Sequence, residues 1–366
     1  MTTKIITIDF TNNNTAIFFP TTTIPVVEES HYYISQGWRI TYSFVISSLT
    51  VVGLLGNILL VVGILSNKTI RHMPLNATLV SMAIANSLYI CVRLLYWIQM
   101  MVTGVDILWV PGEYCWIVRY FPEAFVDVSS GAYLLLSIER SVVVGRCSWA
   151  RRYANVNYIF PANCILWLIA FVSDIPQLIV HYTRVKLSIS KHNVYQCKLG
   201  PDWLRFITTH WVVMDIIFFV IPAILAGILN MHVCYISWNS KLEKTNGEPY
   251  ETVGDFEIWK EHNSKNKRAF NRKSTVAKIV ISFAFFLICF TPDFVVNLLW
   301  FFHTSPSKES VRIAKFTMFI WCAVYPLMHS LFSEVLRNRL KVLLVTFFNH
   351  IGGNSNDKRR LAQSRM

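Results

Sequence analysis

The sequence predicts an all-α membrane protein built as a bundle of seven transmembrane helices. Of its 366 residues, 54% are hydrophobic and 15% are charged, against roughly 25% charged residues in an average soluble domain. The mean hydropathy is +0.42. The apolar residues gather in seven runs, each near the roughly 20 residues that a helix needs to cross a bilayer. These observations point to a chain whose surface is covered by lipid.

The expected spans follow from these runs, and the connectors between them set the domain boundaries. The runs lie approximately at 42–65, 75–102, 114–144, 158–181, 207–238, 274–302 and 313–333. After the last run, "SEVLRNRLKVLLVTFF" alternates basic and apolar residues, which is typical of an amphipathic helix at the membrane surface. We therefore expect an outer tail over 1–40, a seven-helix domain over 41–335, and an interfacial helix with a cytoplasmic tail over 336–366.

The distribution of basic residues predicts the orientation. Lysine and arginine are concentrated in the connectors 66–74, 145–157 and 239–273 and in the C-terminal tail, which the positive-inside rule places in the cytoplasm. The N-terminus is then extracellular and the protein a multi-pass plasma-membrane protein, with the first span as targeting signal because no secretory signal peptide is evident. Asn13 begins the glycosylation sequon "NNT" in the outer tail. Cys115 and Cys197 fall in or beside outer loops, where we expect a disulfide between them.

Several function classes are excluded by composition and motifs. The formal charge of +13 could suggest nucleic-acid binding, but the basic residues lie in short segments between apolar runs instead of on a polar surface. The sequence contains no H-E-x-x-H, G-x-S-x-G or P-loop motif, and its histidines lack metal-ligand spacing. We therefore expect no nucleic acid, no catalytic activity, no metal and no cofactor.

Motifs at matching spacings resemble those of the rhodopsin-like, or class A, G protein-coupled receptors. The triplet "ERS" at Glu139 resembles the family's "DRY" signature, and Arg140 lies 25 residues after Cys115, about 38 Å of helix, so that it meets the cytoplasm. Further matches are "GN" at Gly56 and Asn57, "NATLVSMAIAN" ending at Asn86, "WVPGEYC" through Trp109, Gly112 and Cys115, Trp167, Pro176, Cys197, Pro222, "FLICFTP" with Phe286, Cys289 and Pro292, and Pro326 in "YPLMH".

This resemblance implies a receptor in which ligand binding outside is converted into helix displacement inside. Arg140 is then held by Glu139 at rest, and contacts a heterotrimeric G protein when the sixth span swings about Pro292 and Phe290. Pro292 supplies the hinge because it lacks a backbone N–H. The candidate switch residues are Glu139, Arg140, Asn57, Asn86, Phe286, Phe290, Pro292 and Pro326.

Departures from the family pattern affect the expected switch. Asn86 replaces the aspartate that binds sodium in many relatives, which argues against that ion site. Tyr325 and His329 replace the asparagine and tyrosine of the seventh span, Asn230 replaces a tyrosine of the fifth, and Phe290 replaces the tryptophan of the sixth. Contacts in the active state must therefore use different partners. Such divergence resembles the nematode serpentine chemosensory receptors more than the amine or opsin branches.

Charged residues inside the spans are the candidates for ligand binding, because a charge in a bilayer costs roughly 2.5–3.5 kcal/mol on the insertion scale. Arg119, Glu123 and Asp127 are spaced by four on one helix face, and by resemblance Asp215, Asp293, Asn297 and Lys315 face the pocket. Acids outnumber bases, which favours a cationic or peptide ligand or a charged chemosensory cue. Alternatively the charges pair among themselves, for instance Glu123 with Arg119. For Asp174 a wet helix terminus is favoured over a ligand contact.

Three other functions remain to be weighed against the receptor. A seven-helix transporter or channel would use the same charges as a polar path, without any need for Arg140. A receptor relative that no longer signals is suggested by the lost asparagine and tyrosine of the seventh span. A retinal-binding opsin is suggested by Lys315, but the opsin lysine lies one turn deeper, where this chain has Phe319.

Overall fold

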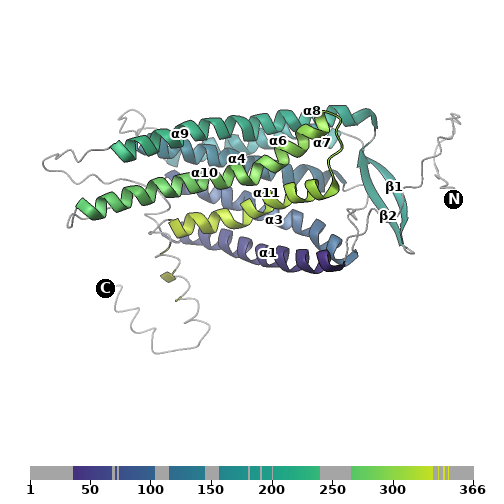
Figure 1. Cartoon of the computed structure of the whole chain (residues 1–366), viewed down its shortest axis with the longest axis horizontal. Coiled ribbons are helices and arrows are strands. Elements are labelled where there is room, and N and C mark those ends of the chain that lie inside the picture. Colours follow the sequence, from purple (N-terminus) through teal and green to yellow (C-terminus); the bar gives the residue numbers. More distant parts are fainter. Residues whose placement is uncertain are drawn as a thin grey trace.

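The protein is a bundle of long helices packed side by side, with a short β-hairpin at one end (Figure 1). The computed structural model describes residues 36–67, 71, 74–103, 115–144, 156–179, 182–189, 192–199, 201–239, 265–332 and the single residues 337, 341, 342 and 345. The elements are α1 (Gln36–Leu65), α3 (Pro74–Thr103), α4 (Cys115–Val144), α6 (Val156–Ser173), α7 (Pro176–Ile179), β1 (Tyr182–Ile189), β2 (His192–Leu199), α8 (Pro201–Asp215), the π-helix η3 (Ile216–Val220), α9 (Ile221–Asn239), α10 (Lys265–Phe301) and α11 (Lys308–Phe332).

The helices agree with the expected runs, apart from their ends and two breaks. Helices α1 and α10, which correspond to the first and sixth expected spans, begin at Gln36 and Lys265, earlier than the apolar runs. The fourth run is divided between α6 and α7, and the fifth between α8, η3 and α9. The antiparallel hairpin β1–β2, which pairs Tyr182 with Leu199, was not expected. The fold is therefore helical with one small hairpin.

Six helical segments among the described residues are long and apolar enough to cross a bilayer. The expected third span, α4, is long enough at 30 residues, but it is not among the helices that are apolar enough to cross a bilayer. Its charged residues are Arg119, Glu123, Asp127, Glu139 and Arg140. It nevertheless packs against α3, α6 and α9, and Ala124, Val128, Ala132 and Leu136 are fully buried. Hydropathy thus supports six of the seven expected spans. The exception is α4, although it packs within the bundle.

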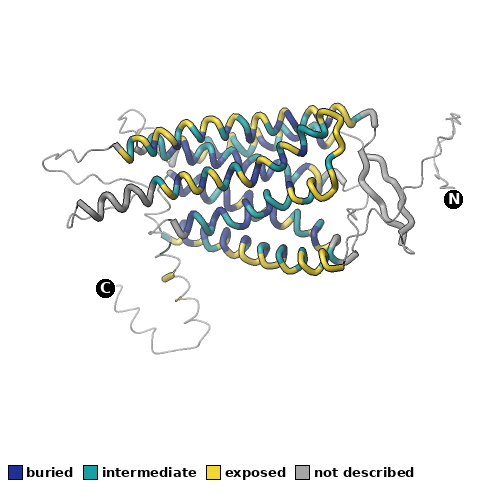
Figure 2. Tube along the Cα trace, in the orientation of Figure 1, coloured by how far each residue is buried: buried dark blue, intermediate teal, exposed yellow. Residues whose placement is uncertain are grey.

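Exposed residues follow the outer sides of the helices, and buried residues lie on the sides that face the bundle (Figure 2). Large hydrophobic side chains such as Phe44, Phe160 and Ile288 are strongly exposed. The core contains residues of α1, α3, α4, η3, α9, α10 and α11, among them the rings of Tyr133 and Trp321. A water-soluble protein rarely exposes so much contiguous apolar surface. This arrangement fits a bundle that is surrounded by lipid.

Proline residues in the long helices leave carbonyl groups that neighbouring helices satisfy. Pro222 has no N–H for the carbonyl of Phe218, and the Ser130 hydroxyl of α4 donates a hydrogen bond to that oxygen. Pro326 likewise leaves the carbonyl of Cys322, which accepts a hydrogen bond of 3.1 Å from the Asn57 amide of α1. Because lipid offers no hydrogen bonds, these side chains stabilise the interruptions of α9 and α11.

A related contact lies one turn before Pro292 in α10. The Thr317 hydroxyl of α11 donates a hydrogen bond of 2.9 Å to the carbonyl oxygen of Cys289, next to the carbonyl of Ile288 that Pro292 leaves without its helical donor. The expected hinge therefore lies within a continuous helix and has a polar partner on α11.

The close packing of α1 on α11 depends on Gly53. A Cβ atom at this position would lie 2.8 Å from both Cα and Cβ of Ala323, so the Gly53→Ala variant must push two helix backbones apart. We expect a free-energy loss of about 1–3 kcal/mol in thermal unfolding of the detergent-solubilised protein. Gly37→Ala is the matched control on the same helix, because its Cβ would meet nothing within 4 Å. Equal melting temperatures for the two variants would contradict this packing.

Candidate functional site

The ionic cluster is a group of charged side chains that joins α3, α4, α10 and α11. Arg93 of α3 forms a salt bridge of 2.7 Å with Glu123 of α4. Lys315 of α11 lies 3.1 Å from Glu123 and 3.0 Å from Asp293 of α10. The Arg93 guanidinium also lies 5.6 Å from the centre of the Tyr89 ring, a cation–π contact. One lysine thus connects three helices through two carboxylates.

Asn297 extends the ionic cluster to α8. Its amide donates hydrogen bonds to Asp215, at 2.9 Å, and to Asp293, at 3.4 Å. Asp293 is only 2% exposed and has Lys315 as its cation, whereas Asp215 has an amide partner. We expected a common interior region for Asp215, Asp293, Asn297 and Lys315, and the structure brings these four residues together with Glu123.

The ionic cluster contains more acidic than basic side chains. Asp127, one turn below Glu123 on α4, makes no hydrogen bond or salt bridge to another described residue, and it is within electrostatic range of Asp174, Glu123 and Asp215. The formal inventory is four acids, Glu123, Asp127, Asp215 and Asp293, against the cations Arg93 and Lys315. Asp127 and Asp215, both half-buried, therefore have no cationic partner among the described residues, and each is stabilised either by protonation or by a cation that binds there.

Charges inside the spans do pair among themselves, but two details expected from the sequence are wrong: the partner of Glu123 and the exposure of Asp174. Glu123 pairs with Arg93 and Lys315, whereas Arg119 is exposed; the four-residue spacing places both on one side of α4 without making them partners. Asp174 is not a wet helix terminus, because it is 1% exposed. Its carboxylate accepts a hydrogen bond of 2.9 Å from Gln177 and lies 3.6 Å from the His210 ring.

A neutral hydrogen-bond chain lies deeper in the bundle. The Trp321 indole N–H of α11 donates to the Ser129 hydroxyl of α4 at 2.9 Å, and that hydroxyl donates to the Asn86 side-chain oxygen of α3 at 2.7 Å. All three side chains are buried. Asn86 stands where the family pattern usually has an aspartate.

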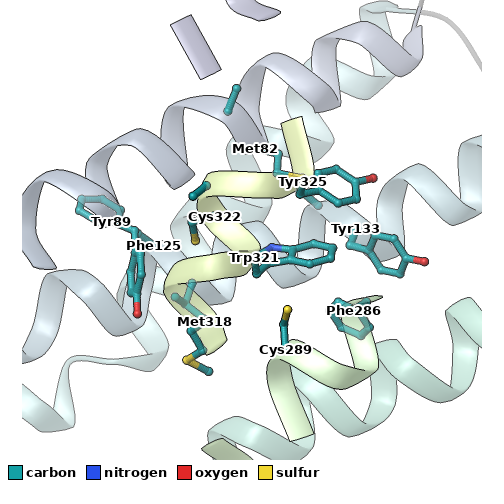
Figure 3. Close-up of a cluster of buried hydrophobic side chains, with 14 of the residues drawn as sticks. Met82, Tyr89, Phe125, Tyr133, Phe286, Cys289, Met318, Trp321, Cys322 and Tyr325 are labelled. Atoms are coloured by element: carbon teal, nitrogen blue, oxygen red, sulfur yellow. The ribbon is translucent and has the colours of Figure 1, made fainter. Parts of the chain in front are cut away.

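Aromatic rings from α4, α10 and α11 pack around Trp321 (Figure 3). Tyr133 stacks on Phe286 with ring centres 4.6 Å apart, and Phe286 lies 4.7 Å from Phe290. Trp321 lies edge-on to these three rings, with centres 5.6, 5.4 and 5.5 Å away, and 4.4 Å from Tyr325. These stacked rings join α4 to α10 at the level of the expected hinge.

At the other end of α4, Glu139 is buried and bound to α3. The Thr78 hydroxyl donates a hydrogen bond of 2.6 Å to Glu139, and the Asn163 amide of α6 donates to the Thr78 oxygen at 3.1 Å. Arg140, the next residue, is half-buried. Glu139 therefore anchors the end of α4 to two neighbouring helices.

Sequence reasoning missed several residues that complete these contacts. Arg93 is a charged residue within a span, but nothing in the sequence indicates that it pairs with Glu123. Ser129, Trp321, Tyr133 and Thr78 carried no signal, because serine, threonine and aromatic residues are common in membrane helices. Asn13, the side chains of Cys115 and Cys197, and the expected interfacial helix lie outside the described residues.

Comparison with known proteins identifies the family. Residues 56–331 match the family described as 7 transmembrane receptor (rhodopsin family). A neuropeptide receptor of Caenorhabditis elegans, neuropeptide receptor 15, is 20% identical over 81% of this chain and 87% of its own length. The C-C chemokine receptor 1-like protein 1 of Mus musculus is 23% identical over 52% of this chain and 50% of its own. The chain is a multi-pass membrane protein and belongs to the rhodopsin family of seven-transmembrane receptors.

Proposed function

We propose that this receptor binds an extracellular ligand with a positive charge and activates a heterotrimeric G protein. The observation that supports this most is the acid surplus of the ionic cluster, which joins helices α3, α4, α8, α10 and α11. Ligand-binding candidates are Glu123, Asp127, Asp215, Asp293, Asn297 and Lys315. An ammonium or guanidinium group entering between Asp127 and Asp215 would supply the missing charge.

The ligand class that we favour is a basic peptide, with cationic small molecules and charged chemosensory cues as alternatives. The C. elegans relative is named as a neuropeptide receptor and the mouse relative as a chemokine receptor-like protein. The hairpin β1–β2 lies at the end of the bundle where α7 ends and α8 begins (Figure 1). Main-chain groups of a hairpin at the entrance would offer hydrogen bonds to an extended peptide.

The proposed topology places α4 as the third of seven spans. The N-terminus is extracellular in the plasma membrane, Asn13 is glycosylated, Cys115 is bridged to Cys197, and residues after 336 form an interfacial helix. The charges of α4 are compatible with a span because Glu123 is paired with Arg93 and Lys315 and Glu139 is bound to Thr78. Helix α4 then carries Glu123 toward the ligand and Arg140 toward the cytoplasm, 17 residues and about 26 Å apart.

Signalling in this proposal is a shift between two populations of the bundle. In this proposal the described arrangement, in which Tyr133 of α4 stacks on Phe286 of α10, is the resting state. A ligand that binds the other state more tightly favours movement of α10 about Pro292 and Phe290. Asn57, Asn86 and Pro326 remain with the frame of α1, α3 and α11, and Arg140 becomes available to the G protein.

The Arg140→Ala variant tests coupling. We expect G protein activation, with and without a cationic peptide library, to disappear in cells at matched surface expression, because the variant loses the charge that contacts the G protein. Arg71→Ala is the matched control: Arg71 is exposed and adjoins the connector between α1 and α3, and its variant should signal as the wild type. Signals indifferent to Arg140, or ligand-dependent ion flux without any G protein response, would contradict the proposal.

A further inference from the structure

Trp321 connects the two parts of the bundle that are expected to move against each other. Its fully buried ring packs edge-on against Tyr133 of α4 and Phe286 of α10 (Figure 3) and against Phe290 of α10. The sixth span lacks the tryptophan of the family pattern and has Phe290 instead. A tryptophan is nevertheless present at this depth: Trp321, on α11 instead of α10. It contacts Phe290, the residue that stands in place of the family's tryptophan.

The same side chain is also the first donor of the hydrogen-bond chain to α3. The indole N–H donates to Ser129, and Ser129 donates to Asn86. The rings of α10 pack against the same indole that makes this hydrogen bond. A movement of α10 that displaces the indole therefore also strains its hydrogen bond to Ser129.

The hydrogen-bond chain does not fit the sodium ion that many relatives bind near the Asn86 position. Asn86 offers an amide in place of a carboxylate, and the indole N–H, a donor, points at the Ser129 oxygen. That oxygen already uses its proton for Asn86 and one lone pair for the indole. One lone pair of that oxygen remains, which is too few ligands for a cation, and neither Asn86 nor Ser129 carries a negative charge to compensate it.

We propose that Trp321 couples α10 to α3 and α4 through its hydrogen bond to Ser129, and that this neutral chain replaces sodium in stabilising the resting state. The stabilising effect of the Trp321–Ser129 hydrogen bond can be measured without a G protein. The effect of Trp321 on signalling rests on the proposed function.

The first test uses stability alone. The melting temperature of the purified wild-type receptor is measured in sodium chloride and in choline chloride of equal ionic strength. The proposal expects no difference between the salts over a concentration series. A rise specific to sodium would overturn the replacement of the ion.

The second test is a double-mutant cycle of Trp321→Phe and Ser129→Ala, with melting temperature as readout. Trp321→Phe keeps an aromatic ring and removes the N–H. Each single variant should lower the melting temperature by about 2–5 °C, and the double variant by no more than the larger single effect. Full additivity would show that the hydrogen bond contributes nothing and would overturn the proposal.

The third test separates coupling from general stability. Trp167→Phe is the matched control, because the Trp167 indole donates a similar hydrogen bond, 2.8 Å long, to Ser81 but is outside the stacked rings. Basal nucleotide exchange on purified G protein should rise about two- to tenfold for Trp321→Phe and remain unchanged for Trp167→Phe. Equal exchange by the two variants would overturn the coupling role. Absence of exchange even for Lys315→Met would instead count against the proposed function, with the two stability tests still deciding the hydrogen-bond chain.

Discussion

Replacing Lys315 by methionine is expected to destabilise the receptor by about 3–5 kcal/mol, the loss typical of a broken buried ion pair. Lys315 lies 3.0 Å from Asp293 and 3.1 Å from Glu123, and Asp293 is 2% exposed. The variant leaves the Asp293 carboxylate with only the amide of Asn297. Glu123 keeps Arg93 as a partner, so the larger part of the loss should arise at Asp293. Thermal unfolding in detergent provides the measurement.

A second variant separates the charge effect from the change of shape. In Lys315→Met/Asp293→Asn the unpaired carboxylate is gone, and we expect the double variant to recover at least half of the lost stability. Glu309→Gln is the control on the same helix, because Glu309 is 71% exposed and its 3.5 Å contact with Arg312 should contribute less than about 1 kcal/mol. A double variant less stable than Lys315→Met would mean that the Lys315–Asp293 pair does not stabilise the fold.

Lys315→Met should also raise basal signalling. Lys315 holds α10 to α4 and α11, and the proposed activation moves α10 away from α4. A loss of about 1.4 kcal/mol from the resting state alone raises the active population about tenfold. Unchanged basal activity in a correctly folded variant would indicate that the ionic cluster does not restrain α10.

Removing one surplus acid is expected to weaken ligands while sparing the empty receptor. Asp127 has no hydrogen bond or salt bridge within the described part of the chain, so Asp127→Asn relieves repulsion from Glu123 and Asp215 and should leave the melting temperature equal or higher. A cationic ligand would lose a charge-assisted hydrogen bond of about 1.5–3 kcal/mol. The half-maximal concentration of any activating cationic peptide should then rise about 10- to 100-fold.

Asp215→Asn tests the second of the two aspartates between which we propose that the cationic group binds. Its partner Asn297 can still form a hydrogen bond to an amide, so we again expect weaker ligand activation without loss of stability. Glu309→Gln, with its exposed acid near the start of α11, controls for a general effect of surface charge on ligand approach. A ligand whose potency is indifferent to both aspartates would contradict a cationic binding position here.

The sequence predicted the positions of the helices well because hydropathy reports length and location along the chain. It also predicted which charges lie inside, since charges in apolar runs are few and costly. Partner choice was less predictable. Each residue turns a helix by about 100°, so a small error in rotation or depth exchanges one partner for another, as with Glu123, which pairs with Arg93 instead of Arg119.

Contacts between uncharged residues were even harder to predict from the sequence. Trp321, Ser129 and Thr78 are residue types that occur throughout membrane helices for packing, and their role emerges only when three helices are placed together. The burial of Asp174 has the same cause: its neighbours Gln177 and His210 come from the next turn and from α8. Charge and hydropathy patterns thus locate the site, whereas tertiary packing determines its connections.

In the proposed mechanism the ionic cluster and Arg140 act at the two ends of one switch. The most direct measurement is basal nucleotide exchange on purified heterotrimeric G proteins by receptor in lipid vesicles, comparing the wild type, Lys315→Met and Lys315→Met/Arg140→Ala. We predict that Lys315→Met exceeds the wild type by about tenfold and that the added Arg140→Ala change returns exchange to the level of empty vesicles. Exchange by Lys315→Met that is no greater than that of empty vesicles with every G protein class, or that persists without Arg140, would contradict the claim.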